Sequence, residues 1–236
     1  MKEIKQITNY EFDSRFYYDQ EDYYPSVTYI LSSTFPSGKG LTNWLGDVGN
    51  KRADEIKVEA GEEGTFVHDA ILKMVSGKEI SSADISQKFR PERSLKIKRC
   101  LQAFLDWNDE AKPEFTKCEY STISKEFRYA GTIDLKCKID GKTFIVDYKT
   151  SRSIQDSARL QIAAYGKSDN NLKDGIAILH LGNTTKKKFS FLDYTDKKTE
   201  LFDKFRLTNR LFQELNPNAR PSEEVFPDKF KIINNK

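Results

Sequence analysis

The chain has 236 residues, with 39 Lys or Arg against 36 Asp or Glu, which gives a formal net charge of +3. Hydrophobic residues make up 37% of the sequence and charged residues 32%, as expected of a globular protein with an ample core. So small a charge is weak evidence for a polyanionic partner, and a mildly basic solvated surface explains it better. No apolar run is long enough to span a membrane and no signal peptide is evident, so we expect no membrane partner.

The first half of the chain reads mainly as helix. Residues 1–24 are rich in Tyr and in acidic side chains and show no clear period. Pro25-Ser26 predicts a short helix over 27–31 with Ser26 as its cap, followed by a loop over 35–40. Hydrophobic periodicity predicts three further helices, over residues 41–59, 62–75 and 92–108.

After Pro113 the hydrophobic period changes from that of a helix to that of strands. One or two strands are expected over 115–128, and two more flank the dipeptide Asp140-Gly141. A helix that stops at Gly166, a buried strand, an edge strand and an amphipathic helix follow, over 154–165, 175–181, 186–193 and 197–215. This order predicts a single α/β domain over 1–236, with a mainly helical part over 1–112 and a mixed central β-sheet flanked by helices over 113–236.

The stretch around Asp140-Gly141 is the strongest local signal in the chain. Alternating residues over 131–139 and 142–149 flank this turn dipeptide, as in a β-hairpin. A two-residue loop pairs Ile139 with Lys142. The same register sets Asp134 opposite Asp147, with Lys149 on the same polar face, whereas Ile133, Leu135, Cys137 and Ile139 share the apolar face.

Two opposed carboxylates repel each other unless something compensates their charge. They can share a proton, bind a cation, or lie in water on an ordinary solvated strand face. Mg²⁺ prefers oxygen ligands and often uses one or two carboxylates together with phosphate oxygens. A lysine beside such a site can stabilise developing negative charge, so Asp134, Asp147 and Lys149 together are typical of phosphodiester cleavage.

Four motifs in order resemble the PD-(D/E)XK nucleases, and most closely their RecB-like exonuclease branch. They are GTFVH at 64–68, GTID at 131–134, DYK at 147–149 and QIAAY at 161–165. The stretch PSVTYIL at 25–31 is also similar to phage exonucleases and to the mitochondrial genome-maintenance exonuclease. The resemblance spans roughly residues 25–181 and implies a restriction-endonuclease-like core.

The resemblance also implies roles for single residues. Asp134 and Asp147, the backbone carbonyl of Tyr148 and His68 would hold Mg²⁺ or Mn²⁺, with Glu119 as a further carboxylate. Lys149 would position or activate the attacking water, and Gln161 and Tyr165 would orient that lysine or the DNA. From the residues alone, a lone histidine such as His68 is more often a buried structural residue, and its place in the motif order reverses that preference. Tyr165 reads from the residues alone as core packing, and His180, at the end of an apolar strand, is assigned no role.

The implied activity is a metal-dependent DNA exonuclease acting on linear DNA with a free end, in recombination, repair or phage DNA metabolism. A recombination or replication protein is a further candidate partner, and the expected location is the cytoplasm of a bacterial or phage-infected cell. Candidate DNA contacts are Ser26, Thr28, Lys39, Lys51, Arg52, Arg152 and the run Lys186–Lys188; each basic one also reads as an ordinary solvated side chain.

Two cofactors found in related enzymes are not expected. Some RecB-like relatives hold an iron–sulfur cluster on four cysteines, but this chain has only Cys100, Cys118 and Cys137, so no cluster is predicted. No GxxxxGK[ST] motif is present, so no nucleotide cofactor is predicted. The alternatives are a non-catalytic DNA-binding or structural module on the same fold, or a DNA endonuclease.

Overall fold

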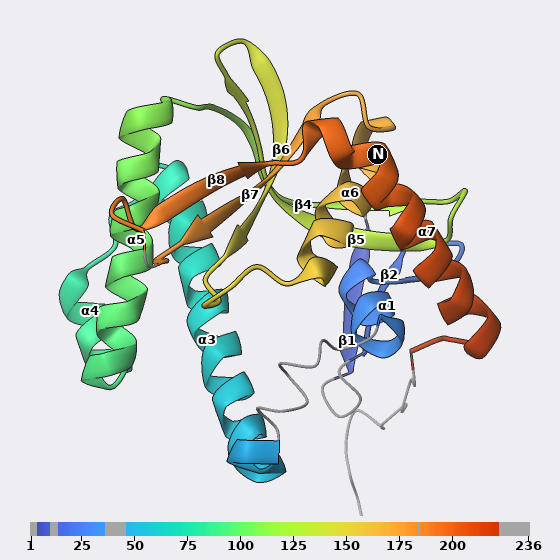
Figure 1. Cartoon of the computed structure of the whole chain (residues 1–236), viewed down its shortest axis with the longest axis horizontal. Helices are drawn as coiled ribbons and strands as arrows, with labels where there is room; N and C mark the ends of the chain where they lie inside the picture. Colours follow the sequence, from blue (N-terminus) through green and yellow to red (C-terminus); the bar gives the residue numbers. More distant parts are fainter. Residues whose placement is uncertain (1–3, 10–13, 36–45, 184, 222–236) are drawn as a thin grey trace, which may run out of the picture.

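The computed structural model describes residues 4–9, 14–35, 46–183 and 185–221 (Figure 1). Its centre is a five-stranded sheet in the order β4-β5-β6-β7-β8. Only β6 and β7 pair in parallel among these strands, and the other pairs are antiparallel, so the sheet is mixed as predicted. The strands are β4 (Glu114–Ser124), β5 (Tyr129–Ile139), β6 (Lys142–Lys149), β7 (Gly175–Leu181) and β8 (Phe189–Asp193).

Helices cover both faces of this sheet, which confirms a mixed α/β fold (Figure 1). On one face lie α3 (Asn50–Val75), α4 (Ser82–Lys88) and α5 (Pro91–Ala111), and on the other α1 (Val27–Thr34), α6 (Asp156–Asn170) and α7 (Lys198–Leu215). The first face buries Leu135 and Val146 against α3 and α5. The second buries Ile145 and Ile178 against α6 and α7, so the sheet separates two apolar cores.

The first 25 residues differ from the prediction of a helical N-terminal part. They contain β1 (Lys5–Asn9), β2 (Ser14–Tyr18) and β3 (Tyr23–Pro25), which form a separate antiparallel sheet. Tyr17 and Tyr24 are buried in it and pack with Ala130 of β5. All three strands are short, and β2 and β3 are aromatic, so a search for amphipathic periods does not detect them.

Several helix boundaries also differ from those predicted. Within 46–111 the helices expected over 41–59 and 62–75 are one continuous helix, α3, and α4 was not anticipated. The start of the first expected helix, 41–45, lies outside the described residues. The helix α6 does not stop at Gly166 but runs on to Asn170. Gly166 is there for space, because a Cβ atom on it would lie 2.7 Å from Cγ2 of Ile176.

The hairpin has the predicted register. Ile139 pairs with Lys142 and Leu135 with Val146, and Asp140 and Gly141 both have positive φ angles, of 48° and 76°. Such angles match the right-handed twist of the flanking strands in a two-residue hairpin loop. The buried strand, the edge strand and the last helix are confirmed as β7, β8 and α7.

The alternation of side chains between the two faces of the sheet breaks midway along the paired strands β4 and β5. Leu135 belongs to the core under α3 and α5, but Ile133 belongs to the core under α6 and α7, so the prediction that both share one face is wrong. On β4 the same switch separates Cys118 from Tyr120. Between them Glu119 has φ of +45°, a left-handed angle that interrupts regular strand geometry.

None of the helices in the described parts of the chain is both long and apolar enough to cross a lipid bilayer.

Two glycines test how tightly α6 packs on the sheet. Gly61 lies within α3 with nothing within 4 Å of an added Cβ, whereas Gly166 faces Ile176. Both alanine variants gain about 1 kcal/mol of helix propensity. Only Gly166→Ala also suffers overpacking, of roughly 1–3 kcal/mol. We expect Gly61→Ala to raise the free energy of unfolding in urea and Gly166→Ala to give a value clearly below that of Gly61→Ala. Equal stabilisation by both would contradict the tight packing.

Candidate metal centre

The long helix α3 brings His68 to the sheet. Its buried side chains Val67, Ala70 and Ile71 hold the helix against the first core. One turn before His68, Gly64 lies beside the end of β6, where an added Cβ would make an ordinary contact with Oγ1 of Thr150 at 3.6 Å. The His68 ring lies 5.5 Å from the ring of Tyr148, edge to face.

Asp134 is the side chain on which the site converges. Its Oδ1 lies 3.3 Å from Nδ1 of His68, and its Oδ2 accepts a 2.6 Å hydrogen bond from the backbone N–H of Tyr148. The strand ladder between β5 and β6 ends one pair earlier, at Leu135 and Val146. The carboxylate therefore takes the place of a strand partner for this N–H, which fixes Asp134 relative to β6.

Glu119 joins this group from the neighbouring strand. Its Oε1 lies 3.6 Å from Nδ1 of His68, and ligand atoms of His68, Glu119 and Asp134 all lie within 4.8 Å of one another. Continuing the two strand registers sets Glu119 opposite Asp134 and Asp134 opposite Asp147. Three acidic residues thus lie side by side in a row on three adjacent strands, at the position where the backbone of β4 is irregular.

Lys149 sits beside this row and is held from two sides. Its Nζ lies 2.5 Å from Oδ2 of Asp147 and donates a 3.1 Å hydrogen bond to Oε1 of Gln161. The Gln161 amide in turn donates to the hydroxyl of Tyr165, 2.8 Å away. The sequence expectation that Gln161 and Tyr165 project from one face of a helix toward the lysine agrees with this geometry.

Tyr165 reaches the site because Gly131 has no side chain. A Cβ on Gly131 would lie 2.3 Å from Cε1 of Tyr165, so the ring packs directly on the backbone of β5. Next to Gly131, Thr132 forms a 2.9 Å hydrogen bond with the hydroxyl of Tyr17. This bond joins the N-terminal sheet to the strand that carries Asp134, a contact that sequence reasoning missed.

The charges of the site are strongly coupled. Burial by itself would lower the pKa of His68, but the charge of Asp134 and hydrogen bonds to Asp134 and Glu119 raise it to about 10. Burial alone would raise the pKa of Asp134, but the charge and hydrogen bond of His68, the charge of Lys149 and the N–H of Tyr148 together lower it. Burial, with the nearby charge of Asp134, raises the pKa of Asp147 to about 6 although Lys149 opposes the shift.

The donor set fits a hard divalent cation. It consists of carboxylate oxygens and one imidazole nitrogen from three separate elements. Asp147 is 2% exposed, whereas His68 and Glu119 are each 27% exposed at their side chains. The site is thus buried on the Asp147 side and open on the His68 and Glu119 side, where a further ligand can approach.

The described residues that were predicted to contact DNA lie on several different elements. Ser26 is buried and its Oγ accepts from the N–H of Tyr29, which confirms its predicted role as the cap of α1. Arg52 pairs with Glu55 near the start of α3, close to the exposed Lys51, while Lys187 pairs with Glu110. Thr28 and Arg152 are exposed, and Lys39 lies outside the described residues.

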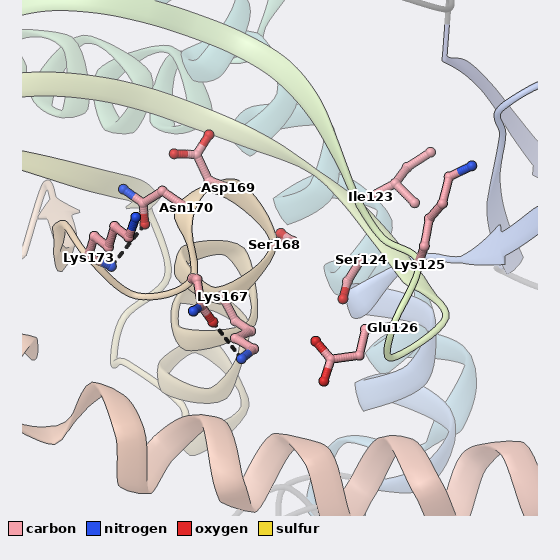
Figure 2. Close-up of a pocket in the computed structure, with 10 residues that line it drawn as sticks. Ile123, Ser124, Lys125, Glu126, Lys167, Ser168, Asp169, Asn170 and Lys173 are labelled. Carbon is pink, nitrogen blue, oxygen red and sulfur yellow. Dashed lines mark hydrogen bonds between the residues drawn. The ribbon is translucent and has the colours of Figure 1, made fainter.

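A surface hollow of the described residues lies elsewhere. A cavity of about 570 Å³ lies between the β4–β5 turn and the end of α6. Figure 2 shows the side chains that line it. Its lining is polar and charged, with Glu126, Lys167 and Asp169 among its residues and none of the candidate metal ligands. The amine of Lys167 already donates to the side chain of Asn171. We assign this cavity no part in the site.

No protein-family model and no curated protein matches the sequence. Fifteen chains of solved structures do match it. One of them, "Crystal structure of SSO0001", is 12% identical with a TM-score of 0.30, over 61% of this chain and 85% of that one. So low a score carries no argument, and the interpretation of the site therefore rests on its own geometry.

Asp147 offers a test of the site's electrostatics without any substrate. A carboxyl whose folded pKa of about 6 exceeds its usual value near 3.9 destabilises the fold once it is charged, that is, as the pH rises through 6. We expect Asp147→Asn, in EDTA, to be more stabilising at pH 8 than at pH 4 by roughly 1–3 kcal/mol of unfolding free energy.

Denaturant unfolding at both pH values measures this difference. Asp54→Asn is the matched control, since its side chain is 70% exposed and no pH-dependent gain is expected there. An effect of Asp147→Asn that is the same at pH 4 and pH 8 would show that the burial of this carboxylate carries no such cost.

Proposed function

We propose that the chain is a Mg²⁺- or Mn²⁺-dependent deoxyribonuclease with a restriction-endonuclease-like core, acting on DNA from its ends. One observation carries the proposal: a lysine held by a carboxylate and an amide stands beside a row of carboxylates and a histidine. Lys149 contacts Asp147 and Gln161, and Asp134 contacts His68. A purely structural module has no need for this combination of like charges in a partly buried place.

His68, Glu119, Asp134 and Asp147 would hold the cation, as carboxylate oxygens and imidazole nitrogens do in other proteins. The backbone carbonyl of Tyr148 is a further candidate ligand. When bound, the ion would supply Lewis-acid polarisation of a phosphate and lower the pKa of a coordinated water. It would also offset the repulsion that Asp134 and Asp147 exert on each other.

Lys149 has the position to assist the chemistry directly. Its side chain is 24% exposed, so it is in part accessible to solvent, while Asp147 and Gln161 fix the direction of the amine. There it can stabilise the negative charge that develops on a phosphate under attack, or hold the attacking water. Tyr165 acts one step further away, by orienting the amide of Gln161.

Linear DNA is the substrate that the motifs favour. The helix with Gln161 and Tyr165 is similar to the Q-x-x-x-Y helix of RecB-like exonucleases, which supports action at ends over internal cleavage. Arg152 is exposed and lies three residues beyond Lys149. From there its guanidinium is a candidate contact for the DNA phosphate backbone next to the site.

The test uses linear single-stranded, linear duplex and closed circular DNA, each with Mg²⁺, Mn²⁺ or EDTA. We expect loss of the linear forms only, dependent on the metal. Lys149→Ala and Asp147→Asn are expected to lower the rate by at least about a hundredfold, as for removal of other groups that stabilise transition-state charge. Circular dichroism of both variants should match that of the parent protein.

The matched control is Lys142→Ala, an exposed lysine at the opposite end of β6 from Lys149, which should retain parent activity. Nicking of the circles would make the enzyme an endonuclease. Full activity of Lys149→Ala, or the absence of metal-dependent cleavage with every DNA, would contradict the proposal.

A further inference from the structure

The buried histidine at the end of β7 lies next to the proposed site but takes no part in its contacts. His180 is 8% exposed and pairs with Lys149 across the parallel strands β6 and β7. It has the same position in the alternation as Ile176 and Ile178, which face α6. His180 therefore lies on the side of the sheet over which the chain crosses from β6 to α6.

The ring of His180 holds that crossing segment. Its Nε2 lies 2.6 Å from the backbone oxygen of Ser151, two residues beyond Lys149. A carbonyl oxygen can only accept, so Nε2 carries the proton and donates. The contact joins residues 29 apart in the sequence and fixes the first residues of the segment 150–155 to the sheet.

His180 is itself held from the other side. The side chain of Asn183 donates to the backbone oxygen of His180 and to Oγ of Ser190, at 3.4 and 2.9 Å. Within the segment, Oγ of Ser151 donates to the oxygen of Ser153, whose own Oγ accepts from Gln155. Hydrogen bonds thus run from the β7–β8 turn through His180 to the residue that precedes α6.

The segment 150–155 separates the two groups whose distance defines the proposed lysine site. Lys149 ends β6, and Gln161 stands on the second turn of α6, yet their side chains meet at 3.1 Å. Any shift of the segment moves α6 relative to β6 and so changes this contact. Displacements of about 1 Å in a catalytic arrangement can lower rates by up to a hundredfold.

We propose that His180 is a positioning residue: by holding the carbonyl of Ser151 it sets the placement of Lys149 against Gln161. The inference rests on the proposed nuclease function. It adds a residue that touches neither substrate nor metal and acts through the segment 150–155.

Three variants of the full chain test it. His180→Leu fills the space without a donor, and His180→Gln restores an N–H donor at a similar reach. Ser76→Ala is the control, because it removes a hydroxyl-to-backbone bond at the end of α3 without touching the segment or His180. The readouts are kcat and KM on linear DNA with Mg²⁺, the thermal midpoint, and amide hydrogen exchange of residues 150–155.

We expect His180→Leu to lower kcat by roughly tenfold to a hundredfold with KM little changed. The segment 150–155 should exchange faster, the thermal midpoint should stay near that of the parent, and His180→Gln should recover most of the rate. A His180→Leu enzyme with parent kcat would overturn the proposal. So would equal loss in both His180 variants with a lowered midpoint, since His180 would then only fill the core.

Failure of the underlying function is distinguishable. If the parent protein cleaves no DNA with either metal, the proposed function fails and hydrogen exchange decides the anchoring alone. Faster exchange of residues 150–155 in His180→Leu, but not in Ser76→Ala, then supports the anchor. Unchanged exchange overturns it.

Discussion

The arrangement of this protein depends on placing like charges side by side at low exposure. Asp134 and Asp147 stand on adjacent strands, and both are almost fully buried. Such a pair is tolerated only where positive charge is close, and the fold supplies it from opposite sides: His68 from α3 against Asp134, and Lys149 from β6 against Asp147. Gly131 of β5 and Gly166 of α6 let α6 pack closely on the sheet, which brings Gln161 into range. Much of the packing around the sheet thus serves to bring compensating groups to two carboxylates.

The site lies where the strands β4 and β5 depart from regular geometry. Glu119 has a left-handed φ of +45°, the side chains of β4 and β5 change faces there, and Asp134 replaces a strand partner for the N–H of Tyr148. A regular strand would point Glu119, Asp134 and Asp147 away from the helix that carries His68. The irregularity turns the Glu119 and Asp134 carboxylates toward His68, and backbone conformations that are costly elsewhere are commonly kept at functional sites for this reason.

Local sequence signals predicted the features of the fold that depend only on residues close together in the chain. Asp140-Gly141 defined the hairpin register and hence the positions of Asp134, Asp147 and Lys149, because a type of turn sets its own pairing. The apolar run 175–181 and the amphipathic helix over 197–215 also follow from period alone. What the sequence could not show depends on contacts between distant segments. From the sequence, Gly166 looks like the end of a helix; the structure shows that it makes room for Ile176. Likewise, alternation alone places Ile133 and Leu135 on one face of the sheet, but the irregular backbone of β4 and β5 puts them on opposite faces. His180 lies next to Lys149 only because β7 pairs in parallel with β6, a choice that no local pattern reveals.

The central claim is that this charge arrangement exists to hold a divalent cation. A crystal structure of the protein with Mn²⁺, read through the anomalous scattering of the ion, tests it most directly. The account predicts one or two strong anomalous peaks bounded by His68, Glu119, Asp134 and Asp147, at about 2.0–2.3 Å from their oxygen and nitrogen atoms. No peak among these residues at millimolar Mn²⁺, with the ion pairs of His68 and Lys149 intact, would contradict it.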